Sequence, residues 1–339
     1  MKKGITMKDI ADRLDISVVT VSKALSDKDG VSEELRSKIT KMAEEMGYRL
    51  NTVARSMKDG YSYNIGIMVP ERFVGNTQSF YPFFYQHISK LLEEYQYYSI
   101  LQVLSAEDED QLVLPRAYFE KKVDGLIVLG QISIEYIQTL QQADVPIVFL
   151  DFYDERVDVD SVVSDNFYAS YEITSYLIKN GHKDIAFIGD IYATSSIQDR
   201  FLGYCKALLA NKIRLEQDYV INDRDKDGRF IKIALPERMP TAFVCNNDEL
   251  AYNFILHLKD KGYRVPEDIS VVSFDNSIYS TVSTPQLTTM VVDVEEMSKT
   301  AIKFIINKIR KENKRYGRIF IKEKILYRDS VKNITPETT

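Results

Sequence analysis

Cysteine, histidine and glycine are scarce in this chain of 339 residues, and each scarcity removes a class of function. The two cysteines, Cys205 and Cys245, have no cysteine or histidine at metal-ligand spacing, so we expect buried free thiols and neither a disulfide nor a zinc site. The three histidines are dispersed, which argues against a histidine metal centre or catalytic relay. The 14 glycines form no G-x-G-x-x-G or Walker pattern for phosphates. We therefore expect no enzyme, no metal and no cofactor.

The chain also lacks a long apolar run. No stretch approaches the roughly 20 apolar residues that cross a bilayer. The basic residues at the start are not followed by the apolar core of a signal peptide. We therefore predict a cytoplasmic protein with no membrane partner. The net charge of −6 is uneven, with +2 over residues 1–60 and −8 over the rest. A basic N-terminal segment suits contact with phosphates even in an acidic protein.

The first 50 residues predict three short helices. Thr6 is an N-cap with Asp9 three positions on, which is a variant of the capping box. Ser17 caps the second helix and Ser32 the third, and Gly47 ends the third. Apolar residues at helical spacing would form a small shared core. Two helices joined by a short turn and closed by a third helix are the helix-turn-helix arrangement.

From about residue 62, short apolar runs alternate with amphipathic segments. The runs predict strands at Asn64–Val69, Tyr98–Leu104, Gly125–Leu129, Pro146–Leu150, Asp184–Ile188, Ala242–Cys245 and Ile269–Phe274. The amphipathic segments predict helices over residues 82–95, 166–180, 197–210 and 248–261. Strands that are apolar throughout indicate parallel sheets covered on both faces. The sequence thus predicts an all-α helix-turn-helix head followed by a doubly wound α/β body.

Motifs along the whole chain carry a resemblance to a known family. The head contains Thr6-Met7-Lys8-Asp9-Ile10-Ala11, Val19-Thr20-Val21-Ser22-Lys23-Ala24-Leu25, Gly47-Tyr48-Arg49-Leu50-Asn51 and Ala54-Arg55-Ser56-Met57. The body contains Val123-Asp124-Gly125-Leu126-Ile127, Gly181-His182-Lys183-Asp184-Ile185, Arg200-Phe201-Leu202-Gly203-Tyr204, Asn247-Asp248-Glu249-Leu250-Ala251, Val265-Pro266-Glu267-Asp268-Ile269 and Pro285-Gln286-Leu287-Thr288-Thr289. From residue 5 to about 295 the chain resembles the lactose-repressor (LacI/GalR) family of transcription regulators. The motifs are specific for the family and not for a member.

The resemblance implies a division into three parts. These are a helix-turn-helix domain over 1–50, a hinge helix and linker over 51–61, and an effector-binding body over 62–339. The body would resemble a periplasmic binding protein with two doubly wound parallel-sheet lobes, an N-lobe of about 62–161 and 293–319 and a C-lobe of about 162–292 and 320–332. Family members are at least dimers, and the C-terminal residues contain no heptad repeat that would add tetramerisation. We therefore expect a homodimer.

The second head helix is the predicted DNA-reading element. Val21 and Leu25 must face the core, so neighbouring residues are left for DNA. Two adjacent exposed valines suit thymine methyl groups, and a lysine can donate to guanine or phosphate. The alternative is that Val18 belongs to the core and that Lys23 is a solvated charge without a DNA contact. The family more often has arginine at the position of Lys23, and a lysine there makes a bidentate contact with guanine less favourable.

The hinge is implied by resemblance to become helical only on DNA. Thr52–Lys58 is too short to form a stable helix alone. Met57 would wedge into the central base step of the minor groove, and Ala54 would let two hinge helices approach. The alternative is an ordinary linker. The complete predicted DNA-contacting set is Thr6, Ser17, Val18, Val19, Thr20, Ser22, Lys23, Asn51, Ala54 and Met57.

The implied effector site lies between the lobes, at the carboxyl ends of the strands. Polar side chains would bind sugar hydroxyls and aromatic side chains would stack on the ligand. The predicted set is Phe80, Tyr81, Asp151, Arg200, Asn247 and Asp275, with Asp151 the weaker member. The alternative for Arg200 is an internal ion pair, and for Asp275 a turn cap. A further arginine, Arg224, would favour an acidic or phosphorylated sugar unless the neighbouring Asp223, Asp225 and Asp227 neutralise it.

The resemblance thus implies a sequence-specific DNA-binding repressor of carbohydrate-utilisation genes. Its partners would be a pseudo-palindromic double-stranded operator and a small, sugar-like effector. One alternative is a catabolite-control regulator whose corepressor is a phosphoprotein that docks partly on residues 294–310. Another is a sugar-binding receptor without a DNA role, which would need a signal peptide and would not need residues 1–58. His182 is expected to be a turn residue and not a catalyst.

Overall fold

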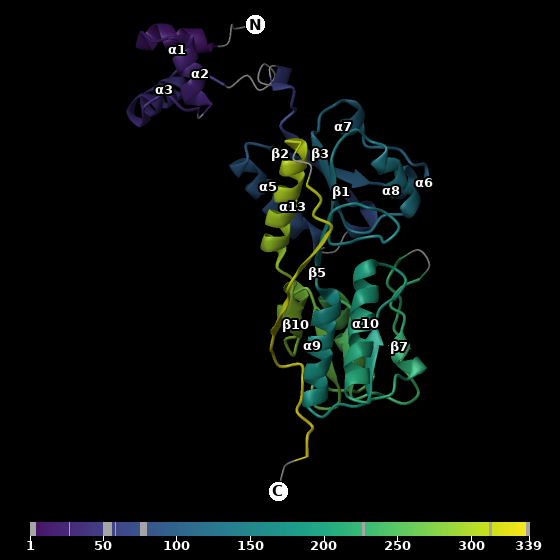
Figure 1. Cartoon of the computed structure of the whole chain (residues 1–339). Coiled ribbons are helices and arrows are strands. Elements are labelled where there is room, and N and C mark those ends of the chain that lie inside the picture. Colours follow the sequence, from purple (N-terminus) through teal and green to yellow (C-terminus); the bar gives the residue numbers. More distant parts are fainter. Residues whose placement is uncertain are drawn as a thin grey trace. The chain divides into compact units, whose positions relative to one another are not determined.

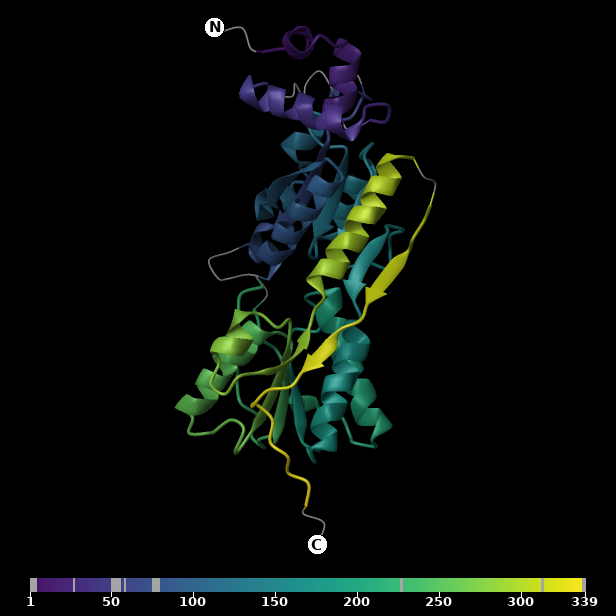
Figure 2. The ribbon, with the colours of Figure 1, turned by 90° about the vertical axis from the view of Figure 1, so that its left-hand side faces the viewer.

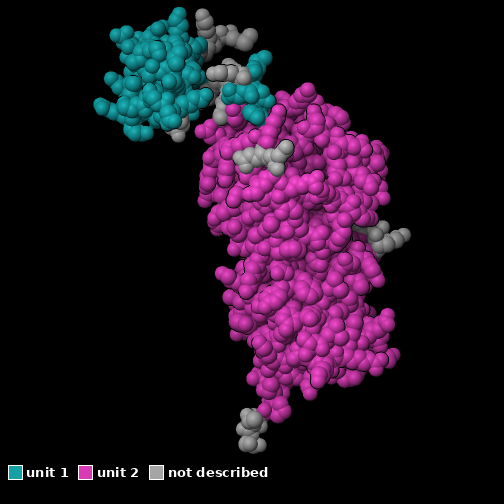
Figure 3. Space-filling model, in the orientation of Figure 1, with its two compact units in different colours: residues 1–61 teal, residues 62–339 magenta. Residues whose placement is uncertain are grey.

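A computed structural model describes residues 5–26, 28–49, 56–57, 59–74, 80–225, 228–311 and 314–336. The chain divides into two compact units, a head of residues 1–61 and a body of residues 62–339 (Figure 3). Two predicted DNA-contacting residues, Asn51 and Ala54, lie outside the described residues, so their roles stay predictions.

The head contains helices α1 (Met7–Leu14), α2 (Val18–Leu25) and α3 (Glu33–Glu45) (Figure 1). The side chain of each predicted N-cap, Thr6, Ser17 and Ser32, accepts a hydrogen bond from the backbone N–H three residues on. The buried core of the three helices consists of Ile10, Ala11, Val21, Ala24, Ile39 and Ala43. This core holds α2 through Val21 and Ala24, so the opposite side of α2 is left to solvent.

The body is built on two six-stranded sheets. In spatial order the first sheet is β11 (Arg318–Ile321), β5 (Ser161–Ser164), β4 (Ile147–Leu150), β3 (Gly125–Leu129), β1 (Asn64–Pro70) and β2 (Tyr98–Leu104). The second is β12 (Lys324–Leu326), β10 (Thr288–Val291), β9 (Ser270–Phe274), β8 (Ala242–Cys245), β6 (Ile185–Ile188) and β7 (Val220–Ile221). All neighbouring strands pair parallel except β10 and β12. The predicted fold class is confirmed.

Helices cover the faces of both sheets. Those of the N-lobe are α5 (Tyr81–Glu94), α6 (Ala106–Asp110), α7 (Arg116–Phe119), α8 (Ile134–Gln141) and α13 (Val294–Ile309). Those of the C-lobe are α9 (Asn166–Lys179), α10 (Ser195–Ala210), α11 (Asp248–Asp260) and α12 (Ile278–Val282), and short 3₁₀ turns lie at Glu71–Phe73 and Gln217–Tyr219. In the N-lobe, α5 and α13 pack together on one face of the sheet and α8 lies on the other (Figure 1).

Strand β6 shows why the strands are apolar throughout. Ala186 and Ile188 belong to the core beneath α11, with Phe254. Ile185 and Phe187 belong to the opposite core beneath α9 and α10. Because successive strand residues point to opposite faces, a sheet with a helical layer on each face needs an apolar residue at every position.

Three connections join the two lobes. They are Asp165 between β5 and α9, residues 292–293 between β10 and α13, and residues 322–323 between β11 and β12. Figure 2 shows β11 and β12 following one another from the first sheet to the second. The first connection falls just after the predicted lobe boundary at residues 161–162, because all four residues of β5 pair with β11 in the first sheet.

Two expectations concern membranes and thiols. Within the part of the chain that the structure describes, no helix is both long and apolar enough to cross a membrane. Cys205 and Cys245 are both free thiols, Cys245 fully buried and Cys205 half-buried.

Candidate functional site

A cleft of about 570 Å³ lies between the two lobes of the body. Its walls come from segments that follow the carboxyl ends of β1 and β4 in one lobe and of β6, β7, β8 and β9 in the other. Ligands of doubly wound sheets bind at such strand ends, where connections diverge to opposite faces. All six residues of the predicted effector set line this cleft. The structure therefore brings together residues that are up to 195 positions apart in sequence.

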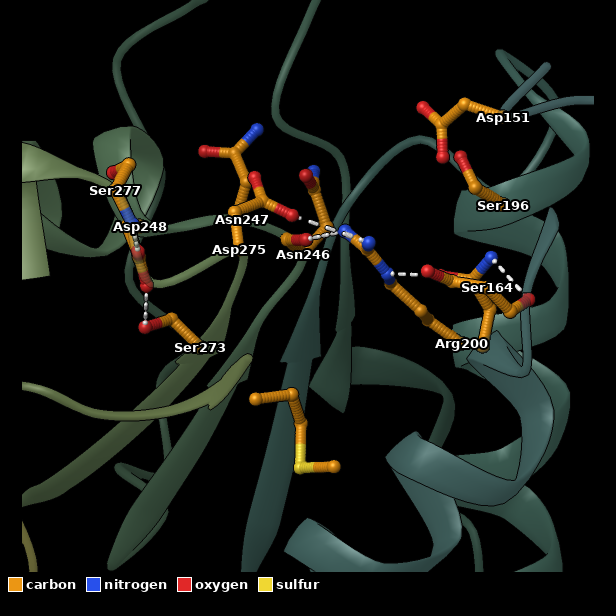
Figure 4. Close-up of polar contacts among 12 residues, drawn as sticks. Asp151, Ser164, Ser196, Arg200, Asn246, Asn247, Asp248, Ser273, Asp275 and Ser277 are labelled. Carbon is orange, nitrogen blue, oxygen red and sulfur yellow. Dashed lines mark hydrogen bonds and ion pairs between the residues drawn. The ribbon is translucent and has the colours of Figure 1, made fainter. Parts of the chain in front are cut away.

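Arg200 is the central cation of the cleft. It extends from α10, and only 6% of the residue is exposed. Its Nε donates to Asn166 Oδ1 at 2.7 Å, one terminal nitrogen donates to the carbonyl of Asn246, and the other lies 3.2 Å from Asp275 Oδ1 (Figure 4). The guanidinium also lies 4.5 Å from the centre of the Phe274 ring. Three of the five guanidinium N–H groups are thus used within the protein, which leaves donors for a ligand.

The carboxylates that surround Arg200 are strongly desolvated. Burial raises the pKa of Asp275, and the Arg200 guanidinium opposes that shift. Burial also raises the pKa of Asp151 to about 7, with Arg200 opposing and Asp275 adding to the shift. Both aspartates have positive φ, 67° for Asp151 and 102° for Asp275, which places their side chains at sharp turns after β4 and β9. These turns direct carboxylates from the two lobes toward one cleft.

Aromatic rings form the N-lobe wall of the cleft. The Tyr81 ring lies 5.0 Å from the Phe73 ring and 5.9 Å from the Phe80 ring, measured between centroids. The Tyr81 hydroxyl donates to Asp151 Oδ2 at 3.1 Å. Phe73 therefore extends the predicted pair of aromatics, although no motif in the sequence marked it as a site residue. Planar rings beside hydrogen-bonding groups suit a ligand with both apolar and polar faces.

Asn247 and Asp248 hold the C-lobe wall. Asn247 caps α11, because its Oδ1 accepts from Leu250 N at 2.8 Å. Asp248 is fully buried and accepts from Ser273 Oγ at 2.5 Å and from Ser277 N at 2.6 Å (Figure 4). These bonds tie the strand ends of β8 and β9 together. Sequence reasoning missed this role of Asp248, although a carboxylate directly after Asn247 in the motif was a signal for it.

Two other arginines line the cleft, and both are paired. Arg224 makes two bonds to Asp223, 2.9 Å from Nε and 2.8 Å from a terminal nitrogen, and Asp223 is fully buried. A terminal nitrogen of Arg72 lies 2.6 Å from Glu109 Oε2. The expectation that Arg224 would favour an acidic sugar depended on its being uncompensated. Asp223 neutralises Arg224, which is the alternative that the sequence left open.

On α2 of the head, the predicted DNA-contacting side chains differ in exposure. Val18 is 42% exposed and Val19 64% exposed, and Lys23 is also exposed. Thr20 and Ser22 are half-buried. The exposure of Val18 argues against the alternative that it belongs to the core. Thr6 and Ser17 are exposed N-caps of α1 and α2 and could also face a phosphate.

Met57 is the most exposed apolar side chain among the described residues of the head, at 84%. Ser56 and Met57 have helical backbone, and Gly60 N donates to the Ser56 carbonyl at 2.8 Å. A methionine this exposed buries little apolar surface within the chain. This position is therefore available for a partner that buries it.

Within the part of the chain that the structure describes, no observation supports a catalytic role. No group of three or more His, Cys, Asp or Glu residues there could hold a metal ion. His182 is 2% exposed, with ring nitrogens 3.0 Å from Thr241 Oγ1 and 3.0 Å from the Lys332 carbonyl. These contacts make it a satisfied structural histidine.

Known proteins resemble both units. Residues 6–51 match the family described as bacterial regulatory proteins, lacI family, and residues 174–331 match a periplasmic binding protein-like domain. The chain is 30% identical to the probable HTH-type transcriptional repressor ExuR of Bacillus subtilis (strain 168), over 98% of this chain and 99% of that protein. The lac repressor dimer bound to operator and the anti-inducer ONPF has a TM-score of 0.75 at 21% identity, covering 97% and 100% of the two chains. The CelR–cellobiose complex of a transcriptional regulator has a TM-score of 0.68 at 22% identity, covering 96% and 99%.

The chain therefore belongs to the lacI family of bacterial regulatory proteins. It is a DNA-binding transcription regulator with an effector-binding body, and it is not an enzyme.

One buried carboxylate near the cleft was not predicted from sequence. Glu323 lies in the connection between β11 and β12 and is only 2% exposed. Burial raises its pKa to about 7; Arg200 opposes this shift and Asp275 adds to it. Its sequence context, Lys322-Glu323-Lys324, is typical of a solvated loop, which is why it gave no signal.

Glu323 should make the stability of the body depend on pH. Because its pKa is higher in the folded than in the unfolded chain, its favourable contribution is present at low pH and is lost as pH rises through about 7. We therefore expect Glu323→Gln to raise the free energy of unfolding above that of wild type. This increase should be about 1–3 kcal/mol larger at pH 8 than at pH 5. Urea unfolding followed by circular dichroism measures this difference.

The matched control is the exposed carboxylate Glu237, whose Glu237→Gln variant also removes one negative charge. A Glu323→Gln effect that is the same at pH 5 and pH 8, or that matches the control, would contradict the assignment.

Proposed function

We propose that this regulator is a repressor that binds a pseudo-palindromic operator as a homodimer and responds to a small, hydroxyl-rich, sugar-like effector in the cleft. The carrying observation is the interlobe cleft itself, where Arg200, Asn247 and Asp275 meet aromatic rings at the carboxyl ends of the strands. Such a mixture of planar rings and fixed hydrogen-bonding groups suits a polyol. The cellobiose complex of the regulator CelR supports a sugar as the class of ligand. A protein that binds operator DNA would act in the bacterial cytoplasm.

The proposed DNA contacts are made by α2 in the major groove. Val18 and Val19 would contact thymine methyl groups, and Lys23 would donate to a guanine or a phosphate. The operator in the lac repressor dimer complex supports DNA of this kind, with one half-site for each subunit. Sugar-dependent regulation then needs a link between this surface and the cleft.

The hinge provides the proposed link. A ligand that bridges the lobes would change the angle between them and hence the separation of the two N-lobes in a dimer. Two hinge segments can enter one minor groove only at the right separation, and Met57 would wedge into the base stack there. Coupling of this kind is reciprocal, so the operator must change effector affinity by the factor by which effector changes operator affinity.

Lys23→Ala should weaken operator binding by about 1–3 kcal/mol and relax base selection at one position in each half-site. The reason is that the exposed ammonium group is the one cation on the predicted reading surface of α2. Gel shift with the operator and single-base variants measures both effects. The control is Lys259→Ala, which removes an exposed lysine from α11 of the body. Equal operator affinities for Lys23→Ala and the control would refute the contact.

Met57→Ala should lower specific affinity more than nonspecific affinity and reduce DNA bending, because the wedge is lost. Met57→Leu should be nearly neutral, since volume and apolarity are kept. Operator and nonspecific binding of both variants, with a bending assay, provide the measurement. The hinge role is wrong if Met57→Ala binds and bends operator as Met57→Leu does.

Asn247→Ser should separate effector binding from folding. Serine preserves the N-cap of α11 but removes the amide that faces the cleft. Loss of one buried hydrogen-bonding group should weaken effector binding by about 1–3 kcal/mol, or roughly 5- to 150-fold. Operator release as a function of effector concentration measures the shift. Ser133→Thr, which changes the N-cap of α8 conservatively and outside the cleft lining, is the control. An unchanged effector response in Asn247→Ser would mean that the amide does not contact the ligand.

A further inference from the structure

The cleft has no uncompensated arginine among the described residues that line it. Arg72, Arg200 and Arg224 are its three lining arginines. A guanidinium nitrogen of each lies within 3.2 Å of a carboxylate oxygen. The partner is Glu109 for Arg72, Asp275 for Arg200 and Asp223 for Arg224. An anionic ligand would therefore have to compete with a carboxylate that the protein already supplies. This competition is costly, because displacing one partner of a buried ion pair leaves a buried charge unpaired.

Carboxylates outnumber guanidinium groups in the same wall. Those that line the cleft are Asp151, Asp190, Asp225, Glu249 and Asp275. Asp190 accepts from the backbone N–H of Tyr192, and burial raises the pKa of Glu249. The described residues that line the cleft thus include more acidic than basic groups, which favours cations over anions.

Asp151 is the lining carboxylate that is best placed to bind a cation. Its Oδ2 accepts from the Tyr81 hydroxyl at 3.1 Å, while no hydrogen bond to Oδ1 is found among the described residues. Arg200 favours its ionised form, but Arg200 pairs directly with Asp275 and not with Asp151. Figure 4 shows Asp151 and Ser196, which both line the cleft, with no hydrogen bond between them. Asp151 is thus a desolvated carboxylate with which no cation among the described residues pairs directly.

The aromatic wall lies next to this carboxylate. Tyr81, which bonds Asp151, packs against Phe73 and Phe80 at centroid distances of 5.0 and 5.9 Å. Ring faces attract ammonium groups, and a carboxylate beside them adds a charge-assisted hydrogen bond. A metal ion is a poor alternative, because no group of three ligating side chains is found among the described residues. The geometry favours an organic cation.

We propose that the effector is a hydroxyl-rich molecule that carries a protonated amine, in chemical class an amino sugar. Its ammonium group binds Asp151 against the Tyr81 wall, and its hydroxyls bind Arg200, Asn247 and Asp275. The cleft discriminates against carboxylated and phosphorylated sugars. This inference rests on the proposed function, since it assigns the ligand class of the same cleft.

The test uses matched sugars that differ in one substituent. For each of the gluco, galacto and manno series, the neutral hexose, the 2-amino-2-deoxyhexose, the hexuronic acid and the hexose 6-phosphate are titrated into the full-length protein by calorimetry at pH 7.5. We expect an amino sugar to bind at least about tenfold more tightly than its neutral counterpart, the gain of one charge-assisted hydrogen bond. We expect the acidic members to bind more weakly than the neutral one.

Asp151→Asn then tests the assigned partner. Asparagine tolerates the positive φ of 67° at this position and retains an acceptor for the Tyr81 hydroxyl, so folding should be preserved. The ratio of amino-sugar to neutral-sugar affinity should fall about tenfold or more in Asp151→Asn. It should be unchanged in the control Asp144→Asn, which removes an exposed carboxylate between α8 and β4.

The outcomes separate the two proposals. If an acidic sugar binds more tightly than the neutral and amino members of its series, or if the affinity ratio is the same in Asp151→Asn and Asp144→Asn, the inference is wrong while the sugar-responsive function stands. If the neutral sugar binds as tightly as the amino sugar, the inference also fails. If no sugar of any series binds, the proposed sugar effector fails and the inference fails with it.

Discussion

The Arg200 guanidinium is the interaction on which the architecture of the cleft depends. It joins Asn166 at the start of α9, the carbonyl of Asn246 after β8 and Asp275 after β9. A buried cation of this kind is stable only while its partners are present, because an unpaired charge in the interior costs several kcal/mol. Asp151, Asp275 and Glu323 in turn depend on Arg200 to moderate the cost of burying their own charges. The site is therefore one electrostatic unit, in which a change of charge at one member alters the pKa values of the others.

Both interpretations of Arg200 that were drawn from the sequence describe part of its role in the structure. The resemblance marked it as a ligand-binding residue, and the alternative was an internal ion pair. The structure places it in the wall of the cleft and in an ion pair at the same time. Pre-positioning by protein partners leaves a binding group little freedom to lose when the ligand arrives, which favours affinity.

The sequence predicted best where local chemistry repeats. The N-caps Thr6, Ser17 and Ser32 and the apolar runs of β1, β3 and β8 each carry their signal within a few residues. Strands β5, β11 and β12 were not predicted, because they are short and belong to sheets through partners distant in sequence. The same limit applies to Glu323, whose burial follows from the connection that contains it. Pairing of Arg72 with Glu109 likewise depends on distant contacts that no local pattern encodes.

The three connections between the lobes have a mechanical consequence. Each lobe is a sheet with packed helical faces and behaves as a stiff body, so relative motion is confined to Asp165, residues 292–293 and residues 322–323. Three tethers between two stiff bodies restrain sliding and twisting more than a single linker would. A ligand between the lobes can therefore act by changing the angle between them, and a molecule that holds the lobes apart would have the opposite effect from one that draws them together.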